Sequence, residues 1–223
     1  TRMLVERSFY ETAVEQARKV AEDTQVATAH QPGRHIGPVV SKQQWDKIQS
    51  LIQTGIDEGA RLVAGGPGLP EGVNRGYFVR PTVFADVTPD MTIATQEIFG
   101  PVLPVLEYDG FDGALSQINA GDNPLAIYYF GHSADRQRRV LRDTLSGSAA
   151  VNEVVAQFLQ VDLPFGGVGA SGFGRYHGAE GFDTFSHLKP IFTQRGMGRF
   201  TGLKLLYPPY SRFAHRLIAM MKG

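Results

Sequence analysis

Residues 102–151 read VLPVLEYDGFDGALSQINAGDNPLAIYYFGHSADRQRRVLRDTLSGSAAV. Short apolar runs in this stretch alternate with longer segments whose apolar residues recur every three or four positions. The first pattern is typical of strands and the second of helices. The stretch predicts strands at residues 102–106, 126–130 and 148–151, and helices at 112–119 and 134–145. Alternating strands and helices of this length form βαβ units, so we expect an α/β fold with a parallel sheet and helices on both faces.

The residues before this stretch continue the same alternation. They predict a helix that begins at Ser8, with Glu11 at the third position of a capping box. The clearest amphipathic helix follows Ser41, which we expect to be its N-cap, with Gln44 at the capping-box position. Because Pro81 lacks a backbone N–H, a strand that contains it is expected at a sheet edge. Strands are predicted here at residues 2–6, 61–64 and 77–84.

Composition bounds the classes of protein that the chain can belong to. It has 223 residues, 22 Lys and Arg against 22 Asp and Glu, and 42% hydrophobic residues. This balance argues against a disordered chain, a collagen-like chain and a coiled coil. A net charge of zero gives no electrostatic reason to expect a nucleic-acid partner. No apolar stretch approaches the roughly 20 residues that span a bilayer, and no signal peptide is visible at the start.

The sequence contains no cysteine. Disulfides, Cys-ligated zinc, iron–sulfur clusters and thiol nucleophiles are therefore excluded within this chain. The histidines show no spacing typical of metal ligands, so we expect no metal site. A chain without cysteine also fits a cytoplasmic location.

A glycine-rich run, PFGGVGASGFG, occupies residues 164–174. Residues 167–172 satisfy the G-x-G-x-x-G pattern of dinucleotide-binding loops, but that motif requires a helix directly after it and the following residues are a poor helix start. The pattern favours a tight loop whose glycines permit positive φ. Ser171, His177 and Asp183 are the residue types of a hydrolase triad, which is a further alternative, although no G-x-S-x-G elbow surrounds Ser171.

The chain ends in a tail of different character. A Gly- and Arg-containing linker at residues 193–202 precedes a basic amphipathic helix predicted at residues 211–222. Such a helix can lie on a membrane surface, but one short helix binds bilayers weakly. Docking on its own domain or on a partner subunit is therefore favoured.

Seven motifs follow one another along the chain: IGPVVS at 36–41, EGARLVAGG at 58–66, GYFVRPT at 76–82, QEIFGP at 96–101, SG to VN at 146–152, PFGGVGASG at 164–172 and TFSH at 184–187. In this order they resemble the aldehyde dehydrogenase superfamily. Residues up to about 108 resemble its broad-substrate branch. The later half resembles the branch that takes fatty and aromatic (coniferyl-type) aldehydes, through PLAIY at 124–128, YHG at 176–178 and YPPY at 207–210.

The resemblance implies the NAD- or NADP-dependent oxidation of an aldehyde to a carboxylic acid. In the family a cysteine thiolate attacks the aldehyde, the thiohemiacetal gives up hydride to the cofactor, and water hydrolyses the thioester. Glu97 resembles the carboxylate that accepts hydrogen bonds from the nicotinamide ribose, and Phe99 resembles the aromatic residue beside it. Gln44 and Lys47 resemble residues that approach the adenosine ribose.

Three further residues, Val155, Phe158 and Phe165, resemble the segment that lines the aldehyde pocket. A buried apolar loop would show the same residue types, so both interpretations stay open. The resemblance also implies a small-molecule aldehyde as partner and a homo-oligomer for the intact parent.

The departures from the family pattern concern its chemistry. The family's Gly-Gln-x-Cys lies a few residues before the segment that resembles residues 1–5, so the nucleophile, the general-base glutamate, the oxyanion-hole asparagine and the cofactor domain are missing. We therefore expect a C-terminal fragment: part of a catalytic domain at residues 1–195 and a tail at 196–223. We expect the chain alone to be inactive. The alternative is a non-catalytic interaction or assembly module derived from the same family.

Overall fold

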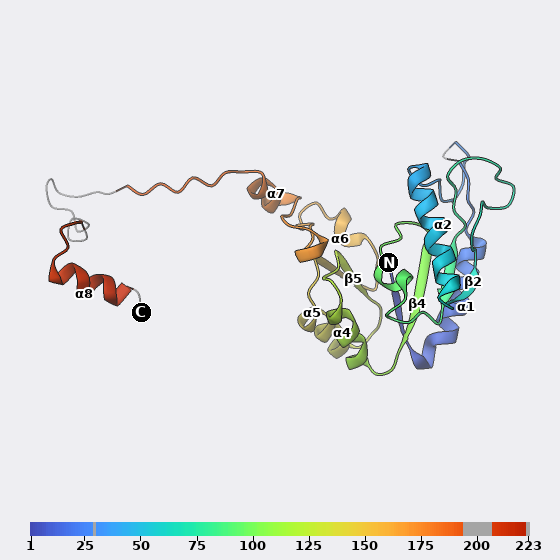
Figure 1. Cartoon of the computed structure of the whole chain (residues 1–223), viewed down its shortest axis with the longest axis horizontal. Helices are drawn as coiled ribbons and strands as arrows, with labels where there is room; N and C mark the ends of the chain where they lie inside the picture. The colour runs from blue at the N-terminus through green and yellow to red at the C-terminus, as the bar shows by residue number, and fades with distance from the viewer. Residues whose placement is uncertain (29, 194–206, 222–223) are drawn as a thin grey trace.

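The computed structural model describes residues 1–28, 30–193 and 207–221. Two sheets and the helices around them form the body of the molecule (Figure 1). The strands are β1 (Met3–Glu6), β2 (Arg61–Ala64), β3 (Thr82–Ala85), β4 (Val102–Tyr108), β5 (Ala126–Tyr129) and β6 (Ser148–Val151). The longer helices are α1 (Tyr10–Asp23), α2 (Lys42–Asp57), α4 (Phe111–Ala120), α5 (Ala134–Asp143) and α8 (Arg212–Met221). Shorter helices are α3 (Thr92–Thr95), α6 (Ala156–Leu159) and α7 (Gly178–Thr184).

The larger sheet has four strands in the order β1-β4-β3-β2. β4 is parallel to both β1 and β3, with Met3 opposite Val105 and Thr82 opposite Val102. The smaller sheet pairs β5 and β6 in parallel, with Ala126 opposite Ser148. The predicted α/β class with parallel strands is confirmed, except that β2 runs antiparallel to β3.

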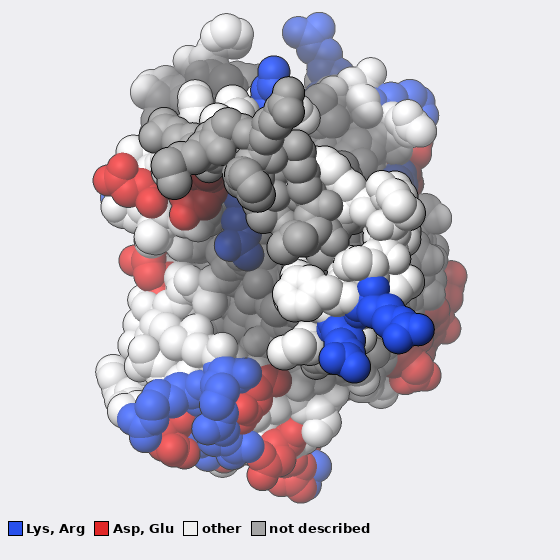
Figure 2. All heavy atoms as spheres, turned by 90° about the vertical axis from the view of Figure 1, so that its left-hand side faces the viewer, with Lys and Arg blue, Asp and Glu red and all other residues white. Residues whose placement is uncertain are grey.

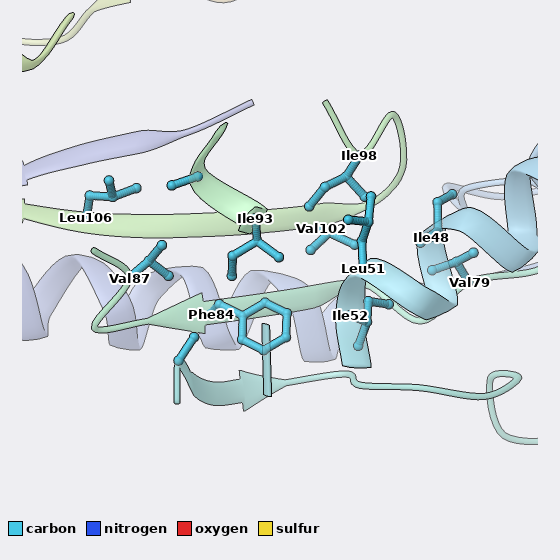
Figure 3. Packing of buried hydrophobic residues seen from close by; sticks show 12 residues of the cluster. Ile48, Leu51, Ile52, Val79, Phe84, Val87, Ile93, Ile98, Val102 and Leu106 are labelled. Atoms are coloured by element: carbon cyan, nitrogen blue, oxygen red, sulfur yellow. The ribbon is translucent and has the colours of Figure 1, made fainter. Parts of the chain in front are cut away.

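Helices cover both faces of the larger sheet, as predicted. Successive residues of β3 point to opposite faces because a strand alternates its side chains. Phe84 is fully buried against α2 and α3, together with Ile48, Ile52 and Ile93 (Figure 3). Val83 and Ala85 pack on the other face against Tyr10 and Val14 of α1. The alternation thus gives the sheet one apolar core on each face.

Two local predictions in this region are wrong. The strand predicted at residues 77–84 begins only at Thr82 and lies between β2 and β4, not at an edge. Pro81 precedes the strand, so its missing N–H does not interrupt the pairing. The helix predicted to begin at Ser8 begins at Tyr10, because Ser8 lies in a 3₁₀ turn and no side chain caps the helix that follows.

The second half of the body contains α4, β5, α5 and β6, close to their predicted bounds. Ser133 caps α5 by accepting a hydrogen bond from the Arg136 backbone N–H. The Arg136 guanidinium then donates to Glu6 at 2.7 Å, which joins α5 to the end of β1. This ion pair links the two sheets.

The tail contains α8, which begins one residue after the predicted start and whose Ala214 N–H donates to the Ser211 hydroxyl. α8 lies apart from the body in Figure 1. The predicted linker at residues 193–202 lies outside the described residues except for Thr193. Within the described ranges, no helix is long and apolar enough to cross a membrane.

Candidate cofactor and aldehyde site

The first group of predicted site residues meets where α2 packs against the segment 96–101, just before β4. The predicted N-cap of α2 is confirmed, because the Ser41 hydroxyl accepts a hydrogen bond from the Gln44 N–H at 3.2 Å. The buried residues Ile48 and Ile52 fix the helix on the sheet. α2 therefore presents Gln44 and Lys47, one turn apart, on a helix whose start and packing are both defined.

The polar ends of Gln44 and Lys47 both bind main-chain carbonyls of this segment. Gln44 Nε2 donates to the carbonyls of Ile98 and Phe99 at 2.9 and 3.1 Å. Lys47 Nζ donates to the carbonyl of Glu97 at 2.8 Å. The capping box predicted for Gln44 is therefore only half formed, because its side-chain amide serves the loop instead of the start of the helix.

The segment presents Glu97 and Phe99 to solvent. Phe99 has a φ of +55° and is 74% exposed. Positive φ is a genuine outlier for a bulky residue and costs on the order of 1–3 kcal/mol. Among the described residues, no hydrogen bond or ion pair engages the exposed Glu97 carboxylate. A free carboxylate and an exposed aromatic ring thus lie on one constrained turn.

The amino group of Thr1 lies within electrostatic reach of this turn. Burial lowers the pKa of the Thr1 amino group below its ordinary value, Arg2 adds to the lowering, and the Glu97 carboxylate opposes it. Glu97 is the one acidic group in this balance. The start of β1 and the Glu97 turn are therefore neighbours although they lie far apart in the sequence.

The second group of predicted site residues lies around α6. Val155 is the N-terminal flanking residue of α6 and adopts a φ of +64°, and Phe158 lies on the helix. The rings of Phe158 and Phe165 meet edge to face with centroids 5.1 Å apart. Val155, Phe158 and Phe165 are each partly exposed, so they form an open apolar surface and not a fully buried loop.

Tyr176 and His177 join this surface, and sequence reasoning missed them as a part of it. Phe165 and Tyr176 exchange two backbone hydrogen bonds of 2.9 Å. The His177 ring lies 5.8 Å from that of Phe158 and 6.5 Å from that of Phe165. Its Nδ1 is buried without a hydrogen-bond partner among the described residues. The aromatic pair directly after the glycine-rich run was the available signal.

The hydrolase-triad hypothesis is wrong. The Ser171 hydroxyl accepts from the Val168 N–H at 3.0 Å and donates to the Val168 carbonyl at 3.1 Å, so it closes a local turn. His177 Nδ1 has no partner in the described part of the chain, which leaves the pair with Asp183 unmade. A triad requires both hydrogen bonds.

The dinucleotide-loop hypothesis is wrong as well. Residues 169–171 form a 3₁₀ turn, and the next helix, α7, begins only at Gly178. The glycines serve close packing instead, since a Cβ on Gly167 would lie 2.1 Å from the Ser171 carbonyl oxygen. The loop borders an open groove of about 510 Å³ that is also lined by Arg175, Glu180 and Asp183.

Comparison with known proteins decides the family. The aldehyde dehydrogenase family model matches residues 1–191. The chain belongs to the aldehyde dehydrogenase family. An aldehyde dehydrogenase from Bartonella henselae has a similar structure, with a TM-score of 0.78 and 49% identity, over 83% of this chain and 38% of that one. A Mycobacterium tuberculosis aldehyde dehydrogenase solved with NAD+ gives 0.82 and 36%, over 90% of this chain and 40% of that one.

The comparisons also show how much of its relatives' length this chain covers. A curated relative from Staphylococcus epidermidis is 40% identical over 191 residues, which are 86% of this chain and 40% of the relative. The chain thus spans about two fifths of the length of the curated relatives it matches. It corresponds to a fragment of the aldehyde dehydrogenase fold.

Proposed function

We propose that this chain supplies part of the cofactor site and part of the aldehyde pocket of an NAD(P)-dependent aldehyde dehydrogenase. The observation that carries the proposal is the turn at Glu97 and Phe99. Its carboxylate engages no hydrogen-bond partner among the described residues, and its ring is exposed. Residues 1–195 would belong to the catalytic domain and 196–223 to a tail, in a cytoplasmic homo-oligomer.

Glu97 fits the nicotinamide ribose because a carboxylate can accept hydrogen bonds from both ribose hydroxyls. Phe99 would provide an apolar surface beside that ribose, and Gln44 and Lys47 border the same side of the turn. A bound nicotinamide cofactor would accept the hydride that leaves the substrate carbon. The chain's own part is to orient the cofactor. Two similar aldehyde dehydrogenases were solved with NAD+ bound, which supports a nicotinamide cofactor for this family member.

Val155, Phe158 and Phe165 would line the aldehyde pocket. Their partly exposed apolar surface suits the hydrocarbon part of an aldehyde. A Pseudomonas syringae aldehyde dehydrogenase solved with NAD+ and octanal is similar to this chain, with a TM-score of 0.78 and 34% identity, over 83% of this chain and 38% of that one. An apolar aldehyde is therefore the substrate class that we propose.

The thiolate that would attack the aldehyde has to come from outside this sequence, because the chain contains no cysteine. We propose that the chain alone is inactive. Loss of a nucleophile from a covalent mechanism costs on the order of 10⁶ in kcat in another enzyme. Purified chain with NAD+ and octanal should form no NADH, and steady NADH formation would contradict this part of the proposal.

A chimera tests the remainder. Residues 1–191, which the family model matches, replace the corresponding part of the Bartonella henselae relative, whose structure aligns with 83% of this chain at 49% identity. We expect the chimera to oxidise octanal, and Glu97→Gln to lower kcat/KM for NAD+ about tenfold through loss of charge-assisted hydrogen bonds. Glu71→Gln is the matched control, since Glu71 is an exposed loop residue distant in sequence. A folded chimera with no activity, or equal effects of the two substitutions, would contradict the proposal.

One observation favours the second candidate, a non-catalytic assembly module. Large apolar side chains stand exposed along the later part of the chain, among them Phe173, Phe182 and Phe185. Exposed apolar surface of this kind marks an interface or causes aggregation. Size-exclusion chromatography of the purified chain separates the two: a discrete folded oligomer favours the module, whereas aggregation favours a dehydrogenase fragment.

A further inference from the structure

The unusual conformation of Phe99 requires something that holds it. Its φ of +55° is disfavoured for an aromatic residue, and its ring is exposed, so the ring's own packing does not hold the conformation. Backbone strain of this kind persists only where the surroundings over-determine it. The contacts of the main chain around Phe99 are therefore the place to look.

Three side-chain hydrogen bonds from α2 reach three successive carbonyls here. Lys47 binds the carbonyl of Glu97 at 2.8 Å, and Gln44 binds those of Ile98 and Phe99 at 2.9 and 3.1 Å. Consecutive carbonyls can face the same two donors only if the chain turns between them. The donor set thus selects a turned backbone over an extended one.

Packing reinforces the same turn. Gly100 lies so close to α2 that a Cβ on it would be 2.6 Å from Ile48 Cδ1. Ile48 is fully buried and Ile98 nearly so, both in the core that α2 shares with β3 and β4. The turn is therefore fixed both by the packing of Ile98 and Gly100 in the core and by the hydrogen bonds from α2.

We propose that Gln44 and Lys47 are positioning residues for the cofactor site: they act on the cofactor through the Glu97–Phe99 turn, by holding its carbonyls. We call these three hydrogen bonds from Gln44 and Lys47 the clamp. The clamp fixes the position of the Glu97 carboxylate relative to the Phe99 ring before any cofactor binds. The role for the cofactor rests on the proposed function, whereas the clamp itself is a property of this chain.

The full chain allows a test that needs no activity. Gln44→Glu keeps the size of the side chain but replaces its donor with a carboxylate that two carbonyl oxygens would repel. We expect NMR backbone couplings to show loss of positive φ at Phe99. We also expect amide exchange at Val102, whose N–H donates to the Gly100 carbonyl of this turn at 2.8 Å, to rise on the order of tenfold. Gln43→Glu is the matched control, because Gln43 is exposed and makes no side-chain hydrogen bond among the described residues.

A third variant guards against misfolding. Gln44→Lys restores donors at the same position and should retain the turn. If Gln44→Glu leaves the Phe99 couplings and the Val102 exchange rate unchanged in a chain that melts normally, the proposal is overturned. If all Gln44 variants lose the turn equally, including the one with donors, the clamp is also wrong.

The chimera described above then tests the link to the cofactor. Gln44→Glu should raise KM for NAD+ several-fold more than Gln43→Glu does, and Gln44→Lys should recover most of the loss. An unaltered KM with a disordered turn would overturn the positioning role. Failure of the proposed function looks different, because the chimera with the unsubstituted chain would then form no NADH while the NMR result on the chain alone would stand.

Discussion

The two sheets of this chain bury their side chains to different extents. In the first unit, residues 1–108, two apolar cores flank the four-stranded sheet, and every member of both cores lies in this unit. In the second unit, residues 111–185, the buried hydrophobic residues are Ala114, Leu115 and Val140. A two-stranded sheet is marginally stable by itself. The first unit thus contains its own core, whereas the second buries few large side chains and has close backbone contacts, such as those of Gly147, in their place.

The largest test of this difference compares two phenylalanines. Phe84 of β3 is fully buried against α2 and α3, whereas Phe173 is fully exposed at the glycine-rich loop. Phe84→Ala should lower the free energy of unfolding by roughly 3–5 kcal/mol. Phe173→Ala should change it by less than about 0.5 kcal/mol. Urea unfolding followed by circular dichroism measures both.

Equal effects of the two substitutions would break the comparison. A large loss in Phe173→Ala would mean that the exposed ring is covered in solution, for instance by a second copy of the chain. Repeating the measurement at several protein concentrations separates that case, because association makes apparent stability depend on concentration.

Most of the first unit could be predicted because its sequence patterns are local. The spacing of Ile48 and Ile52 and the cap at Ser41 predict α2, and both are confirmed. The pairing partners could not be predicted in the same way. Residues 77–84 contain Pro81 in a mostly apolar run, and only the tertiary fold decides that the strand starts after the proline and lies inside the sheet.

The candidate site divides in a similar manner. Motif resemblance named Glu97, Phe99, Gln44 and Lys47, and the structure brings all four to one turn. It could not predict that the two α2 side chains bind carbonyls, because a hydrogen bond between residues some fifty positions apart depends on packing. His177 was missed in the aromatic surface because its neighbours Phe158 and Phe165 are separated from it in sequence.

A glycine substitution tests whether close backbone contacts hold the second unit. A Cβ on Gly147 would lie 2.1 Å from the Gly166 carbonyl oxygen and 2.8 Å from that of Leu125, and backbone cannot move aside easily. Gly147→Ala should therefore cost roughly 1–3 kcal/mol of the free energy of unfolding. Gly113→Ala on α4 meets no atom within 4 Å and should stabilise by up to about 1 kcal/mol. A tolerated Gly147→Ala would show that side chains, not backbone contacts, define this unit.

The ion pair that links the two units should contribute less to the free energy of unfolding. Arg136 and Glu6 lie 2.7 Å apart with side chains 42% and 30% exposed, so solvent weakens their attraction. A double-mutant cycle of Glu6→Gln and Arg136→Gln should give a coupling energy of about 0.2–1 kcal/mol. The more exposed pair of Arg138 and Asp135 should give none that is measurable. A coupling above this range would mean that the two units unfold as one through this contact.

The smallest expected effect lies on the solvent side of the first unit, in α1. Hydrogen bonds from Arg18 lower the pKa of the Glu15 carboxyl to about 2, against an ordinary value of 4.5. A carboxyl whose folded-state pKa is lowered stabilises the fold above its ordinary pKa, and this contribution is lost as the pH falls from about 4.5 towards 2. Arg18→Gln should return the Glu15 pKa towards its ordinary value. Lys19→Gln should raise the Glu15 pKa less, because Lys19 Nζ lies 3.6 Å from Glu15 Oε1 whereas Arg18 Nη2 lies 2.7 Å from it. An NMR titration of the Glu15 side-chain carboxyl carbon measures both shifts. Equal pKa shifts in the two variants would mean that the positive charges near Glu15, and not the Arg18 hydrogen bonds, control the pKa of this carboxyl.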